Sequence, residues 1–164
     1  AGAQENGLDV LSVYIEKQPD MILSQSEGIT KALIEKGIAN TKANIKQKSA
    51  NILLDFYGIH RITQEPFING LIAALNNKNL KIQAAAVSST NSIMGAYGAK
   101  AFSFKPFVGI MEKFAGVSNA QVRGEALNFY KEAYKWVRDL ILPSVDKLKK
   151  AQQDELKKTF EELT

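Results

Sequence analysis

The segment VRGEALNFYKEAY, which runs from Val122 to Tyr134, has three counterparts earlier in the chain. They are AQENGLDVLSVYI from Ala3, IKQKSANILLDFY from Ile45 and IQAAAVSSTNSIM from Ile82. Aligned on their first residues, the four segments share a column of small side chains and, beside it, a mostly apolar column: Gly7, Ser49, Ala86 and Ala126, then Leu8, Ala50, Val87 and Leu127. Their second column holds long polar side chains: Gln4, Lys46, Gln83 and Arg123. These matching columns indicate an internal repeat.

The spacing of the repeat predicts the fold class. The segments recur about every 40 residues, and each of the later three follows a shorter amphipathic segment that ends in a polar turn. A helix pair repeated at this period is typical of HEAT and armadillo solenoids, in which each pair packs only on its neighbours. We therefore predict an all-α HEAT-repeat solenoid. An irregular helical bundle is the alternative, and the matching columns favour the solenoid.

The apolar residues follow a helical period almost throughout, and no stretch shows the sustained alternation of a strand. Two stripes with three- and four-residue steps illustrate this period: Leu8, Leu11, Tyr14 and Ile15, then Ile45, Ile52, Leu53, Phe56 and Tyr57. Helix breaks are expected at residues 18–20, Gly58, residues 76–79, Gly98, Gly116 and residues 118–119. Pro66, Pro106 and Pro143 lie where helices can begin, because proline is tolerated in a first turn. We predict about nine helices and no sheet.

Composition is that of one packed domain, which we expect to cover residues 1–164. The chain has 164 residues, of which 45% are hydrophobic and 23% are charged. No apolar run reaches the roughly 20 residues that span a bilayer, and no secretory signal is visible in AGAQENGLDV at the start. The absence of cysteine excludes disulfides, thiol catalysis and thiolate metal sites.

Lysines and acids are separated along the sequence, although the net charge is only +4. No acid lies between Glu35 and Asp55, or between Glu65 and Glu112. In a solenoid of helix pairs, the turns inside successive pairs lie along one edge, and here they are residues 40–44, 76–80 and 117–121. Any one of Lys42, Lys78 and Lys81, taken alone, would be interpreted as a solvated surface residue. Together they predict a basic, amide-rich edge that meets an acidic partner.

The chemistry-bearing residues do not form a catalytic pattern. His60 is the only histidine, and the chain has no HExxH, Walker or GxGxxG motif. We therefore predict no enzyme activity, no metal and no cofactor. The edge also lacks interleaved aromatic residues, which argues against stacking on single-stranded nucleic acid. Trp136, Tyr130 and Tyr134 have a core-like spacing and are interpreted as packing residues.

The last part of the chain, residues 118–163, resembles the TOG domain of the microtubule polymerase (Dis1/TOG) family. In that family a V-R-x-E-A loop leads into a helix that closes with Y-[KR]-W-[IV]-R-D, followed by a proline and L-K-x-x-Q-x-x-E-L. This chain has VRGEA from Val122, YKWVRD from Tyr134, Pro143 and LKKAQQDEL from Leu148. The stretch NNKNLKI from Asn76 is similar to the family's D-N-K-N-P-K-[IV] loop. The resemblance is strongest to the first TOG domain of such polymerases, and before Asn76 it extends by repeat pattern only.

The resemblance implies a paddle of HEAT repeats whose loops inside each repeat grip a curved αβ-tubulin dimer and promote microtubule growth. It also implies a cytoplasmic protein of the cytoskeleton, at microtubules, spindle poles or centrosomes. The binding loops would lie at residues 1–4, 41–46, 77–81 and 118–123. The expected tubulin contacts are Thr41, Lys42, Lys46, Asn77, Lys78, Lys81, Ser118, Asn119 and Arg123, of which Arg123 matches a basic residue that the family uses on α-tubulin.

One expected feature of the family has no counterpart. The family's first repeat carries a tryptophan that contacts β-tubulin, whereas Trp136 belongs to a later repeat and the chain opens in what resembles the second helix of a repeat. We therefore expect an N-terminally truncated domain that self-associates or frays along the apolar stripe that begins at Leu8. Two other functions remain open, an adaptor for another acidic protein and a HEAT protein that binds duplex nucleic acid. No membrane partner is expected.

Overall fold

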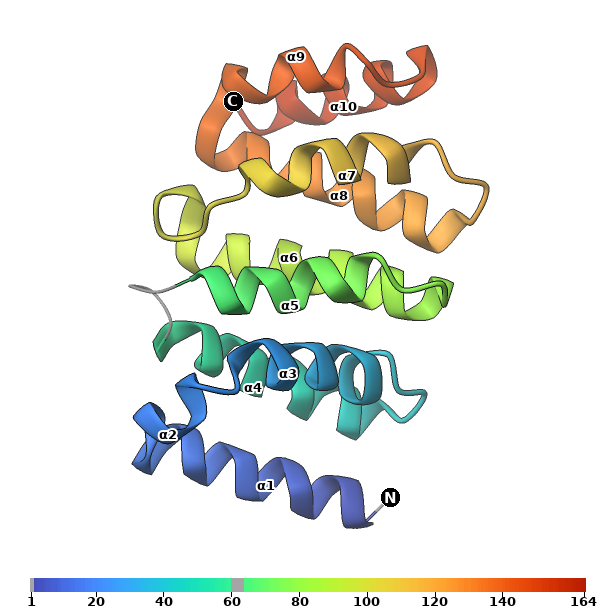
Figure 1. Cartoon of the computed structure of the whole chain (residues 1–164). Helices are drawn as coiled ribbons and strands as arrows, with labels where there is room; N and C mark the ends of the chain where they lie inside the picture. Colours follow the sequence, from blue (N-terminus) through green and yellow to red (C-terminus); the bar gives the residue numbers. More distant parts are fainter. Residues whose placement is uncertain (1, 60–63) are drawn as a thin grey trace. The chain divides into compact units, whose positions relative to one another are not determined.

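The computed structural model describes residues 2–59 and 64–164 (Figure 1). The chain divides into two compact units, Ala1–Ser89 and Thr90–Thr164, which we call unit 1 and unit 2. The described residues form ten α-helices, one π-helix and one 3-10 helix and contain no strand, which confirms the all-α prediction. The total exceeds the predicted nine partly because single-turn segments such as α2 (Pro19–Leu23) and α9 (Leu142–Val145) form helices of their own. No helix of this described part has the length and apolar character needed to cross a membrane.

Unit 1 contains a lone helix and then helix pairs. Its elements are α1 (Gly2–Lys17), α2, α3 (Ser26–Ala32), the π-helix η1 (Leu33–Ile38), α4 (Ala43–Ile59), α5 (Glu65–Leu75) and the first part of α6 (Leu80–Ala101). The chain passes from α3 directly into η1, and these two segments together form the first helix of a pair whose second helix is α4. The helix α1 packs on α4, and α3 packs on α5. Gly58, which the sequence predicted as a break, lies inside α4.

Small side chains in unit 1 allow close contact between helices. Gly37 in η1 faces Ser49 in α4, and a Cβ added at Gly37 would overlap the Ser49 side chain. Ser49 belongs to the column of small residues that the four repeated segments share, as do the fully buried Ala86 and Ala126. Gly7 of the same column is exposed on α1. The small-residue column therefore marks a buried helix face in three of the four repeats.

The two apolar stripes predicted in unit 1 differ in outcome. On α4, Ile45, Ile52, Leu53, Phe56 and Tyr57 are all buried, as predicted. On α1, Ile15 is buried and Leu8 and Leu11 are half-buried, but the side chain of Tyr14 is 42% exposed, so its assignment to the stripe was wrong. The reason is geometric, because at about 3.6 residues per turn Leu8, Leu11 and Ile15 share a helix face that Tyr14 lies beside.

Unit 2 is built around α8 (Ala120–Val137). It begins within α6 at Thr90 and also contains α7 (Lys105–Ala115), the 3-10 helix η2 (Arg138–Ile141), α9 and α10 (Lys150–Glu162). Because α8 contacts α7, η2 and α10, its apolar residues are enclosed from several sides. Tyr130 is fully buried, and the ring of Tyr134 stacks on Phe160 with their centroids 3.9 Å apart.

Trp136 has a different environment from the one predicted. Its side chain is 49% exposed, whereas Tyr130 and Tyr134 are buried as expected. The indole lies over Gly98, where α6 is kinked, and its Nε1 donates a hydrogen bond of 3.2 Å to Oε1 of Glu132. Trp136 is therefore a packing residue at the surface of unit 2 and not in its core.

Proline marks helix starts in both units. Pro66, Pro106 and Pro143 lie in the first turn of α5, α7 and α9, as the sequence predicted, and Pro19 opens α2. These positions need no backbone donor, so proline does not weaken the helices. The helix boundaries therefore agree with the predicted breaks at residues 18–20, 76–79 and 116–119.

Candidate functional site

Two loops of unit 1 lie at the same end of their helices. The first loop (39–42) joins η1 to α4 and the second loop (76–79) joins α5 to α6, and both are on the right in Figure 1. The N-terminal end of α1 lies at this end of the unit too, because Asn44 of α4 hydrogen-bonds to Glu5 of α1. We call residues 40–46 and 76–81 the loop edge of unit 1.

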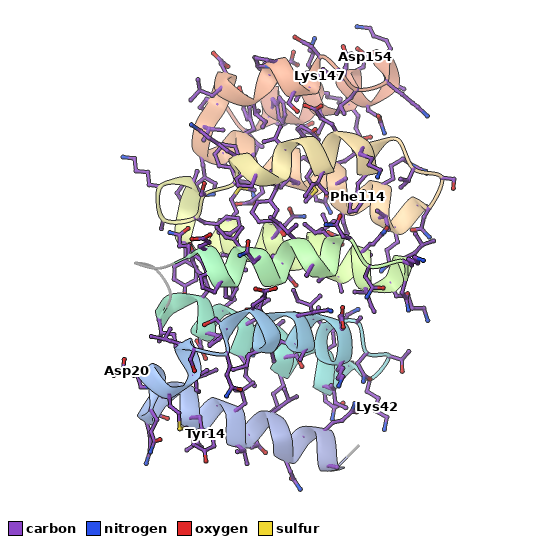
Figure 2. The ribbon with its side chains drawn as sticks, in the orientation of Figure 1. Tyr14, Asp20, Lys42, Phe114, Lys147 and Asp154 are labelled. Carbon is purple, nitrogen blue, oxygen red and sulfur yellow. The ribbon has the colours of Figure 1, made fainter. Side chains whose placement is uncertain are left out.

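The first loop is shaped by the side chain of Asn40. Its Nδ2 donates to the carbonyl oxygen of Lys36 at 3.2 Å, and its Oδ1 accepts from the backbone N–H of Lys42 at 2.9 Å. Such local bonds between an asparagine side chain and the backbone define a tight turn. The side chains of Thr41, Lys42 and Lys46 are exposed, and Figure 2 shows Lys42 projecting from the loop edge.

The second loop is held by two asparagines and by a glutamate of the preceding helix pair. Asn77 donates through Nδ2 to Oε1 of Glu35 at 3.0 Å and accepts through Oδ1 from the backbone N–H of Asn79 at 2.9 Å. The Oδ1 of Asn79 in turn accepts from the backbone N–H of Lys81 at 2.9 Å. Lys78 and Lys81 are exposed on this framework, whereas the half-buried Asn77 side chain already has partners within the unit.

The third loop (116–119) belongs to unit 2 and joins α7 to α8. Asn119 caps α8, since its side chain accepts from the backbone N–H of Val122 at 2.9 Å. Arg123 folds back over the loop, and its Nη1 donates to the carbonyl oxygens of Val117 and Ser118, both at 2.9 Å. Ser118 is exposed, whereas Asn119 and Arg123 are half-buried.

Four lysines give the loop edge of unit 1 its charge. Lys42, Lys46, Lys78 and Lys81 are exposed, and within residues 2–59 and 64–164 none of them forms an ion pair. The ion pairs of that part of the chain involve other lysines, such as Lys48 with Asp9 and Lys147 with Glu112. Because no acid neutralises these four cations, they create a positive field that extends about 10 Å at ordinary salt. This edge is suited to an acidic partner.

The start of the chain does not form a loop, contrary to the assignment of residues 1–4 to a binding loop. Helix α1 already begins at Gly2, and Gln4 lies in its first turn. Residue 1 lies outside the described residues. Since Glu5 bonds to Asn44, the first turn of α1 borders the loop edge as a helix end.

Among the described residues, the two shifted pKa values belong to one hydrogen-bond chain in unit 2. The Tyr130 hydroxyl donates to Oγ of Ser144 at 3.0 Å, and Ser144 donates to Oε1 of Glu112 at 2.8 Å. The bond from Ser144, aided by Lys147, holds the pKa of Glu112 below its usual value. Burial raises the pKa of Tyr130 to about 12. These groups join α7, α8 and α9, so both shifts have a structural cause.

Within residues 2–59 and 64–164, no three His, Cys, Asp or Glu side chains are grouped to hold a metal ion. Glu35 is engaged by Asn77, and Asp55 and Glu65 lie on α4 and α5. His60 falls outside the part of the chain that the structure describes.

Sequence reasoning identified the loops and three of the residues that hold them, Asn77, Asn119 and Arg123. It assigned no such role to Glu35 or Asn40, although Asn40, Asn77, Asn79 and Asn119 together give each of the three loops an asparagine. Asparagine is enriched in turns because its side chain replaces a backbone partner, so its recurrence was a usable signal. Glu35 carries no such signal, because its bond to Asn77 spans 42 residues of sequence.

Comparisons with known proteins agree on one family. The family model described as XMAP215/Dis1/CLASP, TOG domain, matches residues 1–160. Protein mini spindles of Drosophila melanogaster is 25% identical over 162 residues, which cover 98% of this chain and 8% of that protein. The spindle pole body component alp14 of Schizosaccharomyces pombe is 24% identical over 163 residues, which cover 98% of this chain and 20% of that protein. The chain therefore spans a small part of each relative.

Solved structures share the fold. A structure from work on tubulin recruitment and assembly by microtubule polymerases with TOG domain arrays has a TM-score of 0.83 at 23% identity, covering 98% of this chain and 34% of that one. The MAST/Orbit N-terminal domain has a TM-score of 0.82 at 17% identity, covering 95% of this chain and 70% of that one. At these identities the similarity establishes the HEAT-repeat helical fold, which confirms the fold class that the repeat spacing predicted.

Proposed function

We propose that this chain, which belongs to the XMAP215/Dis1/CLASP TOG domain family, is a non-catalytic module that binds αβ-tubulin. Residues 1–164 act as one TOG-like HEAT-repeat domain in this proposal. The observation that carries it is the loop edge of unit 1, where four exposed lysines have no acidic partner among the described residues. They lie on two loops held by side-chain hydrogen bonds and on the first turns of the helices that follow. The similar structure from work on tubulin recruitment by TOG domain arrays supports the choice of partner.

The proposed contacts lie on the three loops and on the first turns of the helices that follow them. They are Thr41, Lys42, Lys46, Asn77, Lys78 and Lys81 in unit 1, and Ser118 and Asn119 in unit 2. Arg123 belongs to this site through the third loop, where its Nη1 donates to two loop carbonyl oxygens. Tubulin is an acidic dimer, so the unpaired lysines attract it over a distance and raise the rate of encounter. Contacts by exposed hydroxyls such as those of Thr41 and Ser118 then form as water leaves the interface.

Loops of fixed conformation would also make this chain prefer one conformation of tubulin over another. Each loop is held by at least two side-chain hydrogen bonds, so the loops keep their conformation before the partner arrives. A preformed surface binds best to the partner conformation that matches it, and it shifts the partner's equilibrium only by that difference in affinity. We infer that curved tubulin is the conformation preferred by this chain.

The role of the whole protein follows from linked copies of such a module. Because the chain spans 8% of mini spindles and 20% of alp14, a longer protein of this kind has room for further domains. Several linked tubulin-binding modules raise the local tubulin concentration and thereby promote microtubule growth. In this proposal the protein acts in the cytoplasm, at microtubule ends and spindle poles.

Size-exclusion chromatography with purified αβ-tubulin tests the proposal. The chain should co-elute with tubulin at low salt and less so at high salt, because exposed charges are screened. Reversal of the four edge lysines to glutamate (Lys42, Lys46, Lys78 and Lys81) should abolish co-elution. A matched control reverses four other exposed lysines without ion pairs in the described residues, Lys17, Lys100, Lys105 and Lys158, and should still co-elute.

The outcomes separate the possible partners. Equal loss in both quadruple variants would mean that net charge and not the loop edge controls binding. Failure of the unaltered chain to bind tubulin at either salt would refute the proposal. If the chain instead bound a DNA duplex with a steep salt dependence, the edge would be a phosphate-binding surface. The three loops contain no aromatic residue, so binding of single strands by stacking is not expected.

A further inference from the structure

One position recurs at the start of the second helix of each pair. It is the fourth residue of that helix: Lys46 in α4, Gln83 in α6, Arg123 in α8 and Gln153 in α10. In the aligned repeats, Lys46, Gln83 and Arg123 also share one column of long polar side chains. We call this position the clamp position, because at three of its four occurrences the side chain returns to the loop before it.

The three returning side chains make the same kind of bond. Gln83 donates through Nε2 to the carbonyl oxygen of Asn77 at 2.7 Å, six residues back. Arg123 donates through Nη1 to the carbonyl oxygen of Val117, also six residues back, and to that of Ser118, both at 2.9 Å. Gln153 donates through Nε2 to the carbonyl oxygens of Asp146 and Leu148 at 2.9 and 2.8 Å. The side chain of Lys46 is exposed and makes none of the hydrogen bonds or ion pairs of the described residues.

The bond needs a donor and not a charge. The loop carbonyls before a helix have no partner in the helix itself, so a side-chain N–H that reaches them fixes the loop backbone. Glutamine and arginine both supply such an N–H at the end of a long side chain. Because neutral glutamine does this at two of the three positions, the charge of Arg123 is not required for the clamp.

We propose that Arg123 acts in tubulin binding as a positioning residue, whose guanidinium holds the third loop in its binding conformation, and that Lys46 is the clamp-position residue whose charge reaches the partner. The inference rests on the proposed function and refines it. It assigns different roles to two residues that occupy equivalent places in the repeat. The half-buried Arg123 donates through Nη1 to its own loop, whereas the side chain of Lys46 is exposed and unpaired in the described residues.

Glutamine and methionine substitutions separate the two roles. Arg123→Gln keeps a donor of the kind found at Gln83 and should retain tubulin affinity within about twofold, whereas Arg123→Met loses the donor and should bind about tenfold more weakly. For Lys46, both Lys46→Gln and Lys46→Met remove the charge, and the two should weaken binding equally. If Arg123→Gln bound as weakly as Arg123→Met while Arg123→Lys bound normally, the charge would contact tubulin directly and the proposal would be wrong.

A measurement without tubulin keeps the inference distinct from the proposed function. The amides of Gly116 and Val117 bond to the carbonyl oxygens of Lys113 and Phe114 at 3.1 and 3.3 Å, so their hydrogen exchange reports opening of the third loop. Exchange should be faster in Arg123→Met and unchanged in Arg123→Gln. Unchanged exchange in both variants would refute the clamp even if tubulin binds, and lack of tubulin binding with this exchange pattern would refute only the function.

The second loop provides a duplicate test. If Arg123→Met fails to fold, Gln83→Met and Gln83→Arg replace the pair, because Gln83 clamps the carbonyl of Asn77 in the same way. The amide of Asn77, which bonds to the carbonyl oxygen of Ala74 at 3.2 Å, then reports loop opening. Gln83→Arg should retain slow exchange and Gln83→Met should not. Equal exchange in these two variants would contradict the clamp.

Discussion

At Gly98, both the backbone and the packing require glycine. Its φ is 79°, in the left-handed region that side chains with a Cβ rarely adopt. A Cβ added there would also lie 3.0 Å from Cζ3 of Trp136. The sequence showed that Gly98 interrupts a helical pattern, but it could not show that an indole covers it. The kink of α6 at Gly98 and the packing of Trp136 against it both require that residue 98 have no Cβ.

Gly98→Ala should therefore destabilise the chain by about 1–3 kcal/mol. Gly109→Ala is the matched control, because Gly109 lies inside α7 with open space around its Cα. There alanine should be neutral or stabilise by up to about 1 kcal/mol, since it favours helix over glycine. Urea unfolding followed by circular dichroism measures both. Equal effects of the two substitutions would show that neither the φ nor Trp136 constrains residue 98.

At the scale of elements, α7, α8 and α9 are joined by the hydrogen-bond chain from Tyr130 through Ser144 to Glu112. Lys147 adds a bond of 3.0 Å to the same carboxylate oxygen. The folded state lowers the pKa of Glu112, chiefly through the Ser144 bond, so it favours the ionised carboxylate. The resulting stability is fully present above the ordinary carboxyl pKa and is lost as the pH falls through the folded-state value.

Glu112→Gln should consequently reduce stability at neutral pH and much less at about pH 3. The quantity to compare is the difference in free energy of unfolding between the unaltered chain and the variant, because other carboxyl groups titrate equally in both. A difference that stays constant between the two pH values would contradict the ionic role of Glu112.

Ser144→Ala tests the same hydrogen-bond chain from its centre. It removes the acceptor of the buried Tyr130 hydroxyl and the donor to Glu112, and should cost about 1–3 kcal/mol at neutral pH. It should also bring the pKa of Glu112 closer to its usual value, which NMR titration of the carboxyl group can follow. An unchanged titration would mean that Lys147 alone sets the shift.

The sequence predicted helices and loops better than it predicted side-chain directions. Periodicity located α4 and its buried face, because apolar residues recur along that helix at three- and four-residue steps. It misplaced Tyr14, since a residue beside an apolar face differs from one on it by a small rotation. It did not reveal the π-helix η1, which packs against α4.

For the candidate site too, the sequence predicted the positions of the loops but not the hydrogen bonds of their side chains. Loops at residues 40–44 and 76–80 follow from the repeat, and their lysines are exposed as expected. The sequence could not show that Asn77 bonds to Glu35 or that Arg123 bonds to its own loop, because such bonds depend on three-dimensional placement. The assignment of Asn77 as a direct contact therefore stays a prediction, and Arg123 is the residue that we propose positions its loop; the bonds by which both shape the loops are observed.

At the scale of the whole molecule, charge placement matters more than charge total. The formal net charge of +4 is small, but the loop edge of unit 1 collects four lysines that no described acid neutralises. A local field of this kind acts on a charged partner before contact, so it changes the rate of association more than the rate of dissociation. The sequence places Lys78 and Lys81 inside the long acid-free interval between Glu65 and Glu112.

Reversal of Lys78 and Lys81 to glutamate should therefore slow association with tubulin by about three- to tenfold and change dissociation less. The salt dependence of association should also become weaker, because less attraction is left for ions to screen. Stopped-flow mixing at two ionic strengths measures both effects, with reversal of Lys100 and Lys105 as the matched control. Melting temperatures should stay unchanged, since none of these four lysines forms an ion pair in the described residues. If the association rate changed with neither the reversal nor the ionic strength, the lysines of this edge would be merely solvated surface residues.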